Sequence, residues 1–449
     1  MGLLVKEKSF YKKFFTLTII IALQNLIVYS VNLADNIMLG GYSEVSLSAV
    51  ALANQIQFLL QMFVLGIGGG MMVLSSQYWG KGEIDAIKKI SNIGIKLSLL
   101  ISFLLLLVIF IFPQQCVSLL TNELEIIEES LKYLKITCFS YIFFALTNSI
   151  LAMFRSIETV KIGFITSLFA LVINVFLNYT LIYGNFGSPE LGTSGAAIAT
   201  LAARIVEFIV VFVYCKFFDK KVKLNFKDFG SIDKNLLKRY IKIGLPTIAS
   251  DTLWGIAMCI QTAILGHIGG EAIAANSISA TMFQIVTVVC YASANATSII
   301  VGKTIGENKI NQVKEYAKTL QVLYVIIGIA TSLTLLFSNN FILSFYNISN
   351  STRYMSYQFI LVLSISVLGT AYECPTLMGI VRGGGDTKFV LINDMLFMWL
   401  IAIPLAIIAA FVLHLSPVIV FACIKLDQLL KCIVAYFKVN KGIWIHQLT

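Results

Sequence analysis

Runs of about twenty apolar residues recur along the whole chain, and they limit its fold more than any other feature. A helix of roughly 20 residues crosses the hydrocarbon core of a bilayer. Because backbone amides find no water in lipid, each crossing segment must satisfy its own hydrogen bonds, which predicts helices. Alternating strands of a membrane barrel would be shorter and much less apolar. The predicted spans, twelve in number, are residues 14–39, 48–74, 88–112, 131–154, 162–184, 193–217, 240–265, 273–301, 317–338, 355–381, 389–412 and 416–437.

Composition supports a membrane protein. Of the 449 residues, 58% are hydrophobic and only 12% are charged, whereas a soluble domain carries about 25% charged residues. The first apolar run is too long for a signal peptide, and no small-residue cleavage site follows it, so we expect it to stay in the mature protein. The chain is therefore predicted to be an all-α integral membrane protein.

The net charge of +10 is distributed by topology. Lysine and arginine collect before the first span and in alternate connections after it. The opposite connections, such as "GGYSEVS" and "NELEIIEES", contribute only Arg353. By the positive-inside rule, both termini are predicted to be cytoplasmic, in a multi-pass protein of the inner (plasma) cell membrane. This distribution does not indicate a nucleic-acid partner.

No pattern indicates an enzyme or a metal centre. The eight cysteines show no CxxC pair, and the three histidines fall in separate loops and the tail. We also find no nucleophile elbow, phosphate loop or triad pattern. The sequence therefore predicts no catalytic residue and no resident cofactor.

The second half of the chain repeats the first when the two are laid over each other. At one offset, Leu39, Gly40, Ala49, Gly80 and Lys88 fall on Leu265, Gly266, Ala275, Gly306 and Lys314, and a shift by one more position brings "RSIETVK" onto "RGGGDTK". A repeat of six helices brings both halves into the membrane from the same side, which predicts two pseudo-symmetric six-helix bundles. We expect an N-lobe at 1–217, a cytoplasmic linker at 218–239 and a C-lobe at 240–449. Two such lobes around a cleft are typical of secondary transporters.

Several segments resemble the signature segments of the multidrug and toxic compound extrusion (MATE) family, in that family's order. They are "LADNIMLG", "NVFLNYTLIYG", "ELGTSGAAIATLAARIVE", "IGLPTIASDTLW", "GIVRGGGDTKF" and "KGIWI". The resemblance implies twelve helices in two six-helix bundles and efflux of small amphipathic, often cationic, compounds. It also implies exchange for H⁺ or Na⁺ as the coupling cation. We expect the protein to act as a monomer in the bilayer.

Three positions depart from the family's pattern. Ile20 stands where a proline is common in the first helix, which argues against a proline-driven bend there. The fifth span carries Asn174 and Asn178 where the motif often ends in aspartate, and the seventh carries Asp251 where many members have glutamate. The N-lobe therefore keeps one acidic group where some relatives have two.

Asp35 is the main candidate in the first half. A carboxylate at the bilayer centre costs at least ~2.5 kcal/mol, so an intramembrane acid is a functional candidate by default. We predict that Asp35 binds the proton or coupling ion, with Gln24, Asn174 and Asn178 as polar support. The alternative is a carboxylate that merely marks the extracellular end of the helix. Arg204 and Glu207, three residues apart, are expected only to neutralise each other.

Three carboxylates in the second half are further candidates for holding the proton or coupling ion, namely Asp251, Glu373 and Asp394. Asp251 lies eleven residues into its span, about 16 Å deep at 1.5 Å per residue. An oxygen-rich Na⁺ site near Asp251 is the one metal site considered, by analogy with other hard cations. The choice between H⁺ and Na⁺ stays open.

Other charges of the second half have no assigned transport role. Lys425 and Asp427 lie in the last span, and their roles are left open. Asp386 lies four residues after Arg382 in a short connection, so we expect it to be structural. Aromatic and methionine residues that line the cleft would suit varied organic cations, but which ones do so needs a register for each helix.

The sequence thus predicts a secondary active multidrug exporter, against which three alternatives stand. A flippase for a lipid-linked precursor would need several lysines or arginines in the cleft to hold pyrophosphate. An intramembrane enzyme would need a catalytic constellation at one depth. An ion channel would need a filter-like segment, which is absent. The flippase is the alternative kept.

Overall fold

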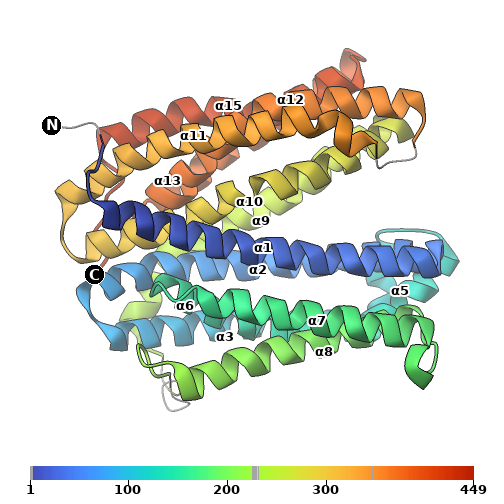
Figure 1. The fold of residues 1–449 in the computed structure, drawn as a ribbon, viewed down its shortest axis with the longest axis horizontal. Coiled ribbons are helices and arrows are strands. Elements are labelled where there is room, and N and C mark those ends of the chain that lie inside the picture. Colours follow the sequence, from blue (N-terminus) through green and yellow to red (C-terminus); the bar gives the residue numbers. More distant parts are fainter. Residues whose placement is uncertain (1–3, 225–229, 231, 345–347) are drawn as a thin grey trace. The chain divides into compact units, whose positions relative to one another are not determined.

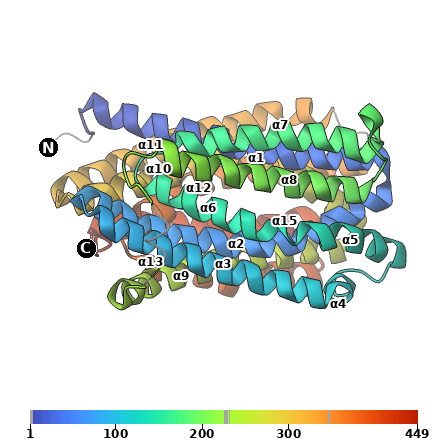
Figure 2. The ribbon, with the colours of Figure 1, turned by 90° about the horizontal axis from the view of Figure 1, so that it is seen from below.

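The computed structural model describes residues 4–224, 230, 232–344 and 348–449, and this part of the chain is almost entirely helical (Figure 1, Figure 2). The helices of the first half are α1 (Lys8–Tyr42), α2 (Glu44–Lys81), α3 (Ile84–Ile111), α4 (Pro113–Ser118), α5 (Leu124–Thr137), α6 (Ser140–Ser156), α7 (Lys161–Tyr183), η1 (Asn185–Gly187), α8 (Thr193–Val213) and η2 (Tyr214–Phe218).

The second half is also helical, with several wide-turn segments. Its elements are α9 (Lys234–Ile268), α10 (Gly270–Gly306), α11 (Ile310–Leu343), α12 (Asn350–Cys374), η4 (Pro375–Val381), α13 (Thr387–Asp394), η5 (Met395–Ala402), α14 (Ile403–Ile407), η6 (Ile408–Val412) and α15 (Pro417–Lys441). The segments η4, η5 and η6 are π-helical. Such insertions are rare and often lie at functional sites.

Most of the predicted spans appear as single helices. Within the described residues, ten helices are long and apolar enough to cross a membrane, or eleven if α5 and α6 form one span. The predicted span over 131–154 consists of the end of α5 and most of α6, two helices that are bent by 53° relative to each other. The last predicted span, α15, is not among these helices, because every 18-residue stretch of it contains Lys425, Asp427 and Lys431.

The described chain packs as two compact units. Helices α1, α2 and α9 each contribute to both of them. The predicted lobe boundaries at 217 and 240 stay a prediction, although α9 already begins at Lys234, inside the predicted linker. Unit 1 consists of Met1–Ala22, Ser76–Gly82 and Ala249–Thr449, and unit 2 of Leu23–Ser75 and Glu83–Ile248.

Each unit has its own apolar core. In unit 2, Leu60, Leu134 and Tyr141 are buried among residues of α2, α5 and α6. In unit 1, Phe359 of α12 stacks on Phe421 of α15, with ring centroids 4.2 Å apart. This packing fixes α15 against α12, which positions the charged residues of α15 described below.

The C-terminal tail, residues 442–449, is bound to unit 1. Gly442, with φ of +70°, ends α15 and turns the chain back. Trp444 is fully buried, and its ring nitrogen donates to the Val439 carbonyl at 2.9 Å. The side chain of Gln77, in the last turns of α2, donates to the His446 carbonyl at 3.0 Å and accepts from the Leu448 amide at 2.9 Å. The tail therefore fastens the end of α2 within unit 1.

The ends of α2 and α10 cross at two glycines of the repeat. A β-carbon added at Gly80 would overlap the carbonyl oxygen of Lys303, and one added at Gly306 would overlap that of Gln77. Gly80 and Gly306 occupy equivalent positions of the sequence repeat, as do Gln77 and Lys303. The crossing therefore has a local twofold symmetry that follows the sequence repeat.

Candidate functional site

In unit 2, Asp35 is held by amide groups. Asp35 lies near the end of α1 and is partly buried, while Asn174 and Asn178 lie one turn apart on α7 and are fully buried. The side-chain N–H of Asn178 donates to Oδ1 of Asp35 and also to Oδ1 of Asn174, the latter at 3.2 Å. The carboxyl group thus has a neutral partner rather than a cation. The structure therefore brings Asp35 next to Asn178 and, through it, Asn174, while their role in transport stays a prediction.

The nearest cation of unit 2 has a different partner. Arg204 of α8 forms an ion pair of 2.9 Å with Glu207 and lies over the Phe144 ring. The expectation that these two charges neutralise each other is confirmed. In the described part of the chain, Asp35 itself forms no ion pair, so Arg204 acts on it only through longer-range charge.

Gln24 does not belong to this group. Its amide packs against Gly163 of α7, where an added β-carbon would lie 2.5 Å from the Gln24 Oε1 atom. Eleven residues separate Gln24 from Asp35, which is about 16 Å along a helix. The structure therefore does not bring Gln24 next to Asp35, since the two residues lie three turns apart on α1, and a role for Gln24 in substrate binding stays a prediction.

In unit 1, Asp251 is bound by an arginine. The guanidinium of Arg382, which follows η4, donates to both carboxylate oxygens of Asp251 on α9, at 2.7 and 3.3 Å. It also donates to Ser250 Oγ at 3.4 Å. The Arg382 and Asp251 side chains are only 6% and 14% exposed. The cation beside Asp251 is therefore a guanidinium of the protein itself.

A second ion-pair group adjoins the first through Ser250. The Ser250 hydroxyl donates to Oδ2 of Asp394 at 2.6 Å, and Oδ1 of Asp394 lies 3.1 Å from the ammonium of Lys431. The same ammonium lies 3.1 Å from Asp427, one turn earlier on α15. The Lys431 side chain is only 4% exposed. These contacts join α9, α13 and α15.

Glu373 and Lys425 lie at the edge of this group. The Glu373 carboxylate, near the end of α12, makes no hydrogen bond or ion pair in the described part of the chain, but it interacts electrostatically with Lys431, Asp394 and Asp427. The Lys425 ammonium lies over the rings of Phe283 and Phe421, 5.4 and 5.6 Å from their centroids. Lys425 is thus not the counter-ion of the acids.

Arg382 and Lys431, the cations that pair with the acids of unit 1, were not among the predicted site residues. Lys431 lies four residues after Asp427, a helical spacing that favours ion pairs and could have revealed it. Arg382 follows the pattern of a topological charge, and nothing in the sequence links it to Asp251, which lies far earlier in the chain. Asp386 pairs with Lys438 at 2.7 Å and caps α13, so it is structural but does not pair with Arg382.

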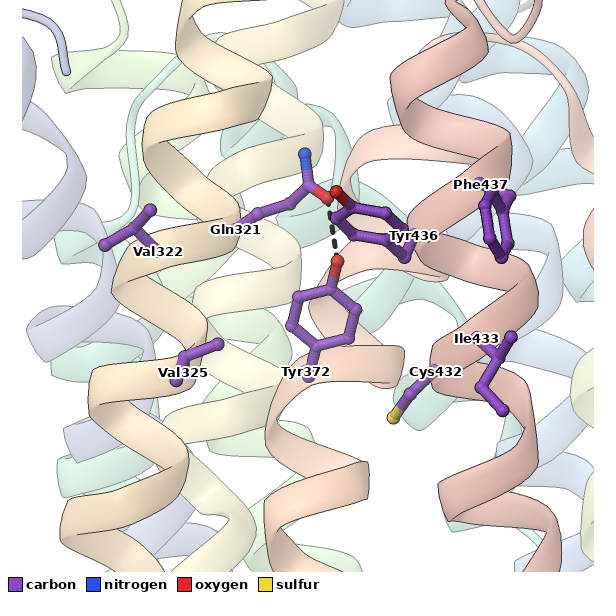
Figure 3. Close-up of a pocket in the computed structure, with 8 residues that line it drawn as sticks. All are labelled: Gln321, Val322, Val325, Tyr372, Cys432, Ile433, Tyr436 and Phe437. Carbon is purple, nitrogen blue, oxygen red and sulfur yellow. Dashed lines mark hydrogen bonds between the residues drawn. The ribbon is translucent and has the colours of Figure 1, made fainter. Parts of the chain in front are cut away.

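An apolar groove of about 480 Å³ lies between α11, α12 and α15 in unit 1 (Figure 3). At one wall the Tyr372 hydroxyl donates to Oε1 of Gln321 at 2.7 Å. The lining residues are Gln321, Val322, Val325, Tyr372, Cys432, Ile433, Tyr436 and Phe437. Its apolar walls suit lipid chains, and none of the carboxylates above lines it.

Comparison with known families agrees with these observations. The family model described as MatE matches residues 21–180 and 246–408, more than half of the chain. The chain belongs to the MatE family. The two matched segments start at nearly equivalent positions of the repeat found in the sequence. The resemblance to MATE transporters is thereby confirmed.

Relatives of this MATE protein include named transporters. The "Uncharacterized transporter YisQ" of Bacillus subtilis is 24% identical over 92% of this chain and 90% of its own. The "Probable multidrug resistance protein NorM" of Listeria monocytogenes is 24% identical over 88% of this chain and 86% of its own. A crystal structure of a mutant of the Vibrio cholerae MATE transporter VcmN matches with a TM-score of 0.88 at 16% identity, over 97% of both chains.

These comparisons confirm the fold class. This MATE protein is an all-α integral membrane protein of the twelve-helix, two-bundle type, with the bent α5–α6 pair and the charged α15 as its two irregular spans. It belongs to a family of multi-pass multidrug efflux transporters, which are not enzymes.

Proposed function

We propose that this protein is an antiporter of the cell membrane that exports small amphipathic organic cations in exchange for H⁺. Both termini would lie in the cytoplasm, as the lysine distribution predicts. The observation that carries the proposal is the neutral setting of Asp35, whose carboxyl group is bound by the amide of Asn178 and, within the described residues, by no cation.

A carboxylate in this setting favours exchange of one cation for another. An ionised acid in an apolar region is costly unless a charge of opposite sign accompanies it. Asp35 has no such partner within the described residues, so a proton or a cationic substrate would neutralise it equally well. The two would compete for one group. Competition at a single site is the simplest basis for antiport.

The unused acceptor of Asn178 supports H⁺ as the competing ion. Its Oδ1 atom is buried and has no hydrogen-bond partner in the described structure. An ionised aspartate only accepts hydrogen bonds, whereas a protonated one carries an O–H donor. Protonation of Asp35 would therefore supply the donor that this buried oxygen lacks, once the amide reorients.

A flippase for a lipid-linked pyrophosphate receives less support. That function needs cations free to bind phosphate. Arg204, Arg382 and Lys431 are each engaged in an ion pair with an acidic residue. Releasing them would leave buried carboxylates uncompensated.

The test is ethidium transport in everted membrane vesicles from a host that lacks its own efflux pumps. With the interior acid, we expect dye uptake that a protonophore abolishes and that an imposed Na⁺ gradient does not restore. Uptake driven by Na⁺ in the presence of protonophore would contradict H⁺ coupling. If neither the H⁺ nor the Na⁺ gradient drives transport of any dye in a broad panel, although the protein is present in the membrane, the exporter assignment is overturned.

A further inference from the structure

We infer that the ammonium of Lys431 occupies the position between the carboxylates of Asp394 and Asp427 in unit 1 and thereby prevents Na⁺ from binding there. Lys431 would then be a specificity-determining residue that leaves H⁺ as the only ion this unit can exchange. The inference rests on the proposed antiport for its meaning in transport, but its test does not require transport.

The ammonium of Lys431 occupies the position that a bound monovalent ion would need. It lies 3.1 Å from carboxylate oxygens of two helices, Asp394 at the end of α13 and Asp427 on α15. The other oxygen of Asp394 accepts from Ser250. The Lys431 side chain is almost fully buried, although that of Asp394 is 22% exposed. The oxygens converge on a cation that is part of the protein.

The remaining acids of unit 1 do not form a second set of oxygen ligands for Na⁺. Both oxygens of Asp251 accept from Arg382. Among the described residues, no three acidic, histidine or cysteine side chains are arranged to hold a metal ion. Of Asp251, Asp394, Asp427 and Glu373, only Glu373 lacks a direct partner in that part of the chain. Hard cations such as Na⁺ need several oxygen ligands at once, and one carboxylate does not provide them.

A tethered ammonium competes strongly with a dissolved ion. Because Lys431 is attached to α15, its effective concentration at the two carboxylates far exceeds that of Na⁺ in solution. Two cations at the same oxygens would also repel each other. A proton differs because it needs only one oxygen, so Glu373 can still take one.

The charged surroundings of Glu373 come from several helices. The titratable groups within electrostatic range are Lys431, Asp394, Asp427, Cys290, Cys374 and Cys432. Only Lys431 among them is cationic. Its removal therefore leaves the two carboxylate oxygens that contact the ammonium, and the nearby charge of Glu373, without a cation, which favours uptake of a Na⁺ ion at the vacated position.

The test measures binding of ²²Na⁺ to the purified full-length protein at alkaline pH. All variants carry Asp35→Asn, so that unit 2 cannot contribute through its carboxylate. Lys431→Met vacates the position, and Lys431→Arg keeps a cation there. Lys425→Met is the matched control, because it removes a lysine from the same helix that makes no ion pair in the described structure.

We expect saturable binding of about one Na⁺ per protein in Lys431→Met alone. The gain over its parent should be roughly a hundredfold in affinity, because juxtaposed like charges strongly oppose binding. At Na⁺ concentrations that saturate Lys431→Met, the parent, Lys431→Arg and Lys425→Met should show no saturable binding. Saturable Na⁺ binding by the Asp35→Asn parent would overturn the inference, as would its absence in a folded Lys431→Met protein.

A second variant guards against misfolding. Lys431→Gln removes the charge but keeps a hydrogen-bond donor near both acids. If Lys431→Met does not fold, the inference is tested by comparing Na⁺ binding of Lys431→Gln, which should bind, with that of the parent. The readout also separates the two proposals. Na⁺ binding restricted to the variants that remove the charge, Lys431→Met and Lys431→Gln, without any dye export by the wild type, refutes antiport and supports the role of Lys431. Dye export together with Na⁺ binding by the parent does the reverse.

Discussion

Asp35 and Asp251 are both aspartates within long apolar helices, yet their partners differ in kind. Asp35 is held by a neutral amide of α7, whereas both oxygens of Asp251 are bound by the guanidinium of Arg382. Asp394 and Asp427 resemble Asp251, because both contact the ammonium of Lys431, a cation of the protein. In the proposed antiport, the carboxylate with a neutral partner is the one that exchanges cations. One with a built-in cation is already neutralised, so its charge serves to join helices.

The first prediction removes the exchangeable charge, and we expect it to have the largest effect. Asp35→Asn keeps the size and polarity of the side chain but cannot take up or release a proton. The protein should reach the membrane in normal amount, since burying the charge no longer costs energy. Ethidium export should fall to the level of vesicles without the protein.

Its control is Glu44→Gln, which alters an exposed carboxylate at the start of α2 in the same unit. That variant should export at the wild-type rate. Export by Asp35→Asn at the wild-type rate, with the same pH dependence, would show that Asp35 is structural. The distinction between the two kinds of carboxylate would then fail.

The second prediction breaks the buried ion pair of unit 1. Arg382→Gln leaves Asp251 without its cation, which should destabilise the protein by about 3–5 kcal/mol. Thermal unfolding in detergent measures this loss. The double variant Arg382→Met with Asp251→Leu removes both charges and should recover most of the stability. Equal destabilisation by the single and double variants would show that charge pairing is not what Arg382 provides.

The third prediction removes the amide that holds Asp35. Asn178→Ala should slow export by roughly tenfold or more, because a lost hydrogen bond to a buried charged group costs about 1.5–3 kcal/mol. Asn174→Ala should have a smaller effect, since the hydrogen bond of Asn174 is to Asn178. Initial rates of ethidium uptake give both values. The reverse order of effects would place Asn174, rather than Asn178, as the main partner.

The fourth prediction concerns Asp233, a carboxylate outside the membrane that is also bound by amide groups, and we expect its effect to be the smallest. Asp233 lies outside the spans, accepts from the backbone amides of Asn235 and Leu236, and pairs with Lys89 at 3.2 Å. The Leu236 amide, followed by the Lys89 ammonium, lowers the pKa of Asp233 from its usual value. Because the folded pKa is the lower one, the stabilisation is present above the unfolded pKa and is lost as pH falls through the folded pKa.

Hydrogen exchange at the start of α9 measures this local effect. Protection of these amides should weaken slightly on acidification below the usual aspartate range, and Asp233→Asn should reduce that pH dependence. Unchanged pH dependence in the variant would assign it to other carboxylates. Dye export near neutral pH should be the same in both proteins.

Some of the site followed from the sequence because its signals are local. Asp35 stands out as a lone acid in an apolar run, and Asn174 and Asn178 share one face of a helix at a spacing of four. Arg204 and Glu207 are equally local. Lys431 carried the same kind of signal relative to Asp427 and was overlooked.

Other contacts depend on tertiary packing and have no local signal. Arg382 and Asp251 lie on elements far apart in the sequence, and so do Lys431 and Asp394. Which acid each cation meets depends on how α9, α13 and α15 pack, and the π-helical turns of η4 and η5 change the direction of side chains there. The bend between α5 and α6 was missed because apolar composition gives helix length but not direction.

The crossing of α2 and α10 has a consequence for how such a chain arose. A six-helix ancestor that paired with a second copy of itself would have placed one glycine in this contact twice, because the interface of a twofold homodimer is self-complementary. Gene duplication and fusion would preserve the contact as Gly80 and Gly306 while freeing their neighbours to diverge. The neighbours have diverged, since Gln77 now holds the C-terminal tail, whereas its counterpart Lys303 lies 4.0 Å from Glu307.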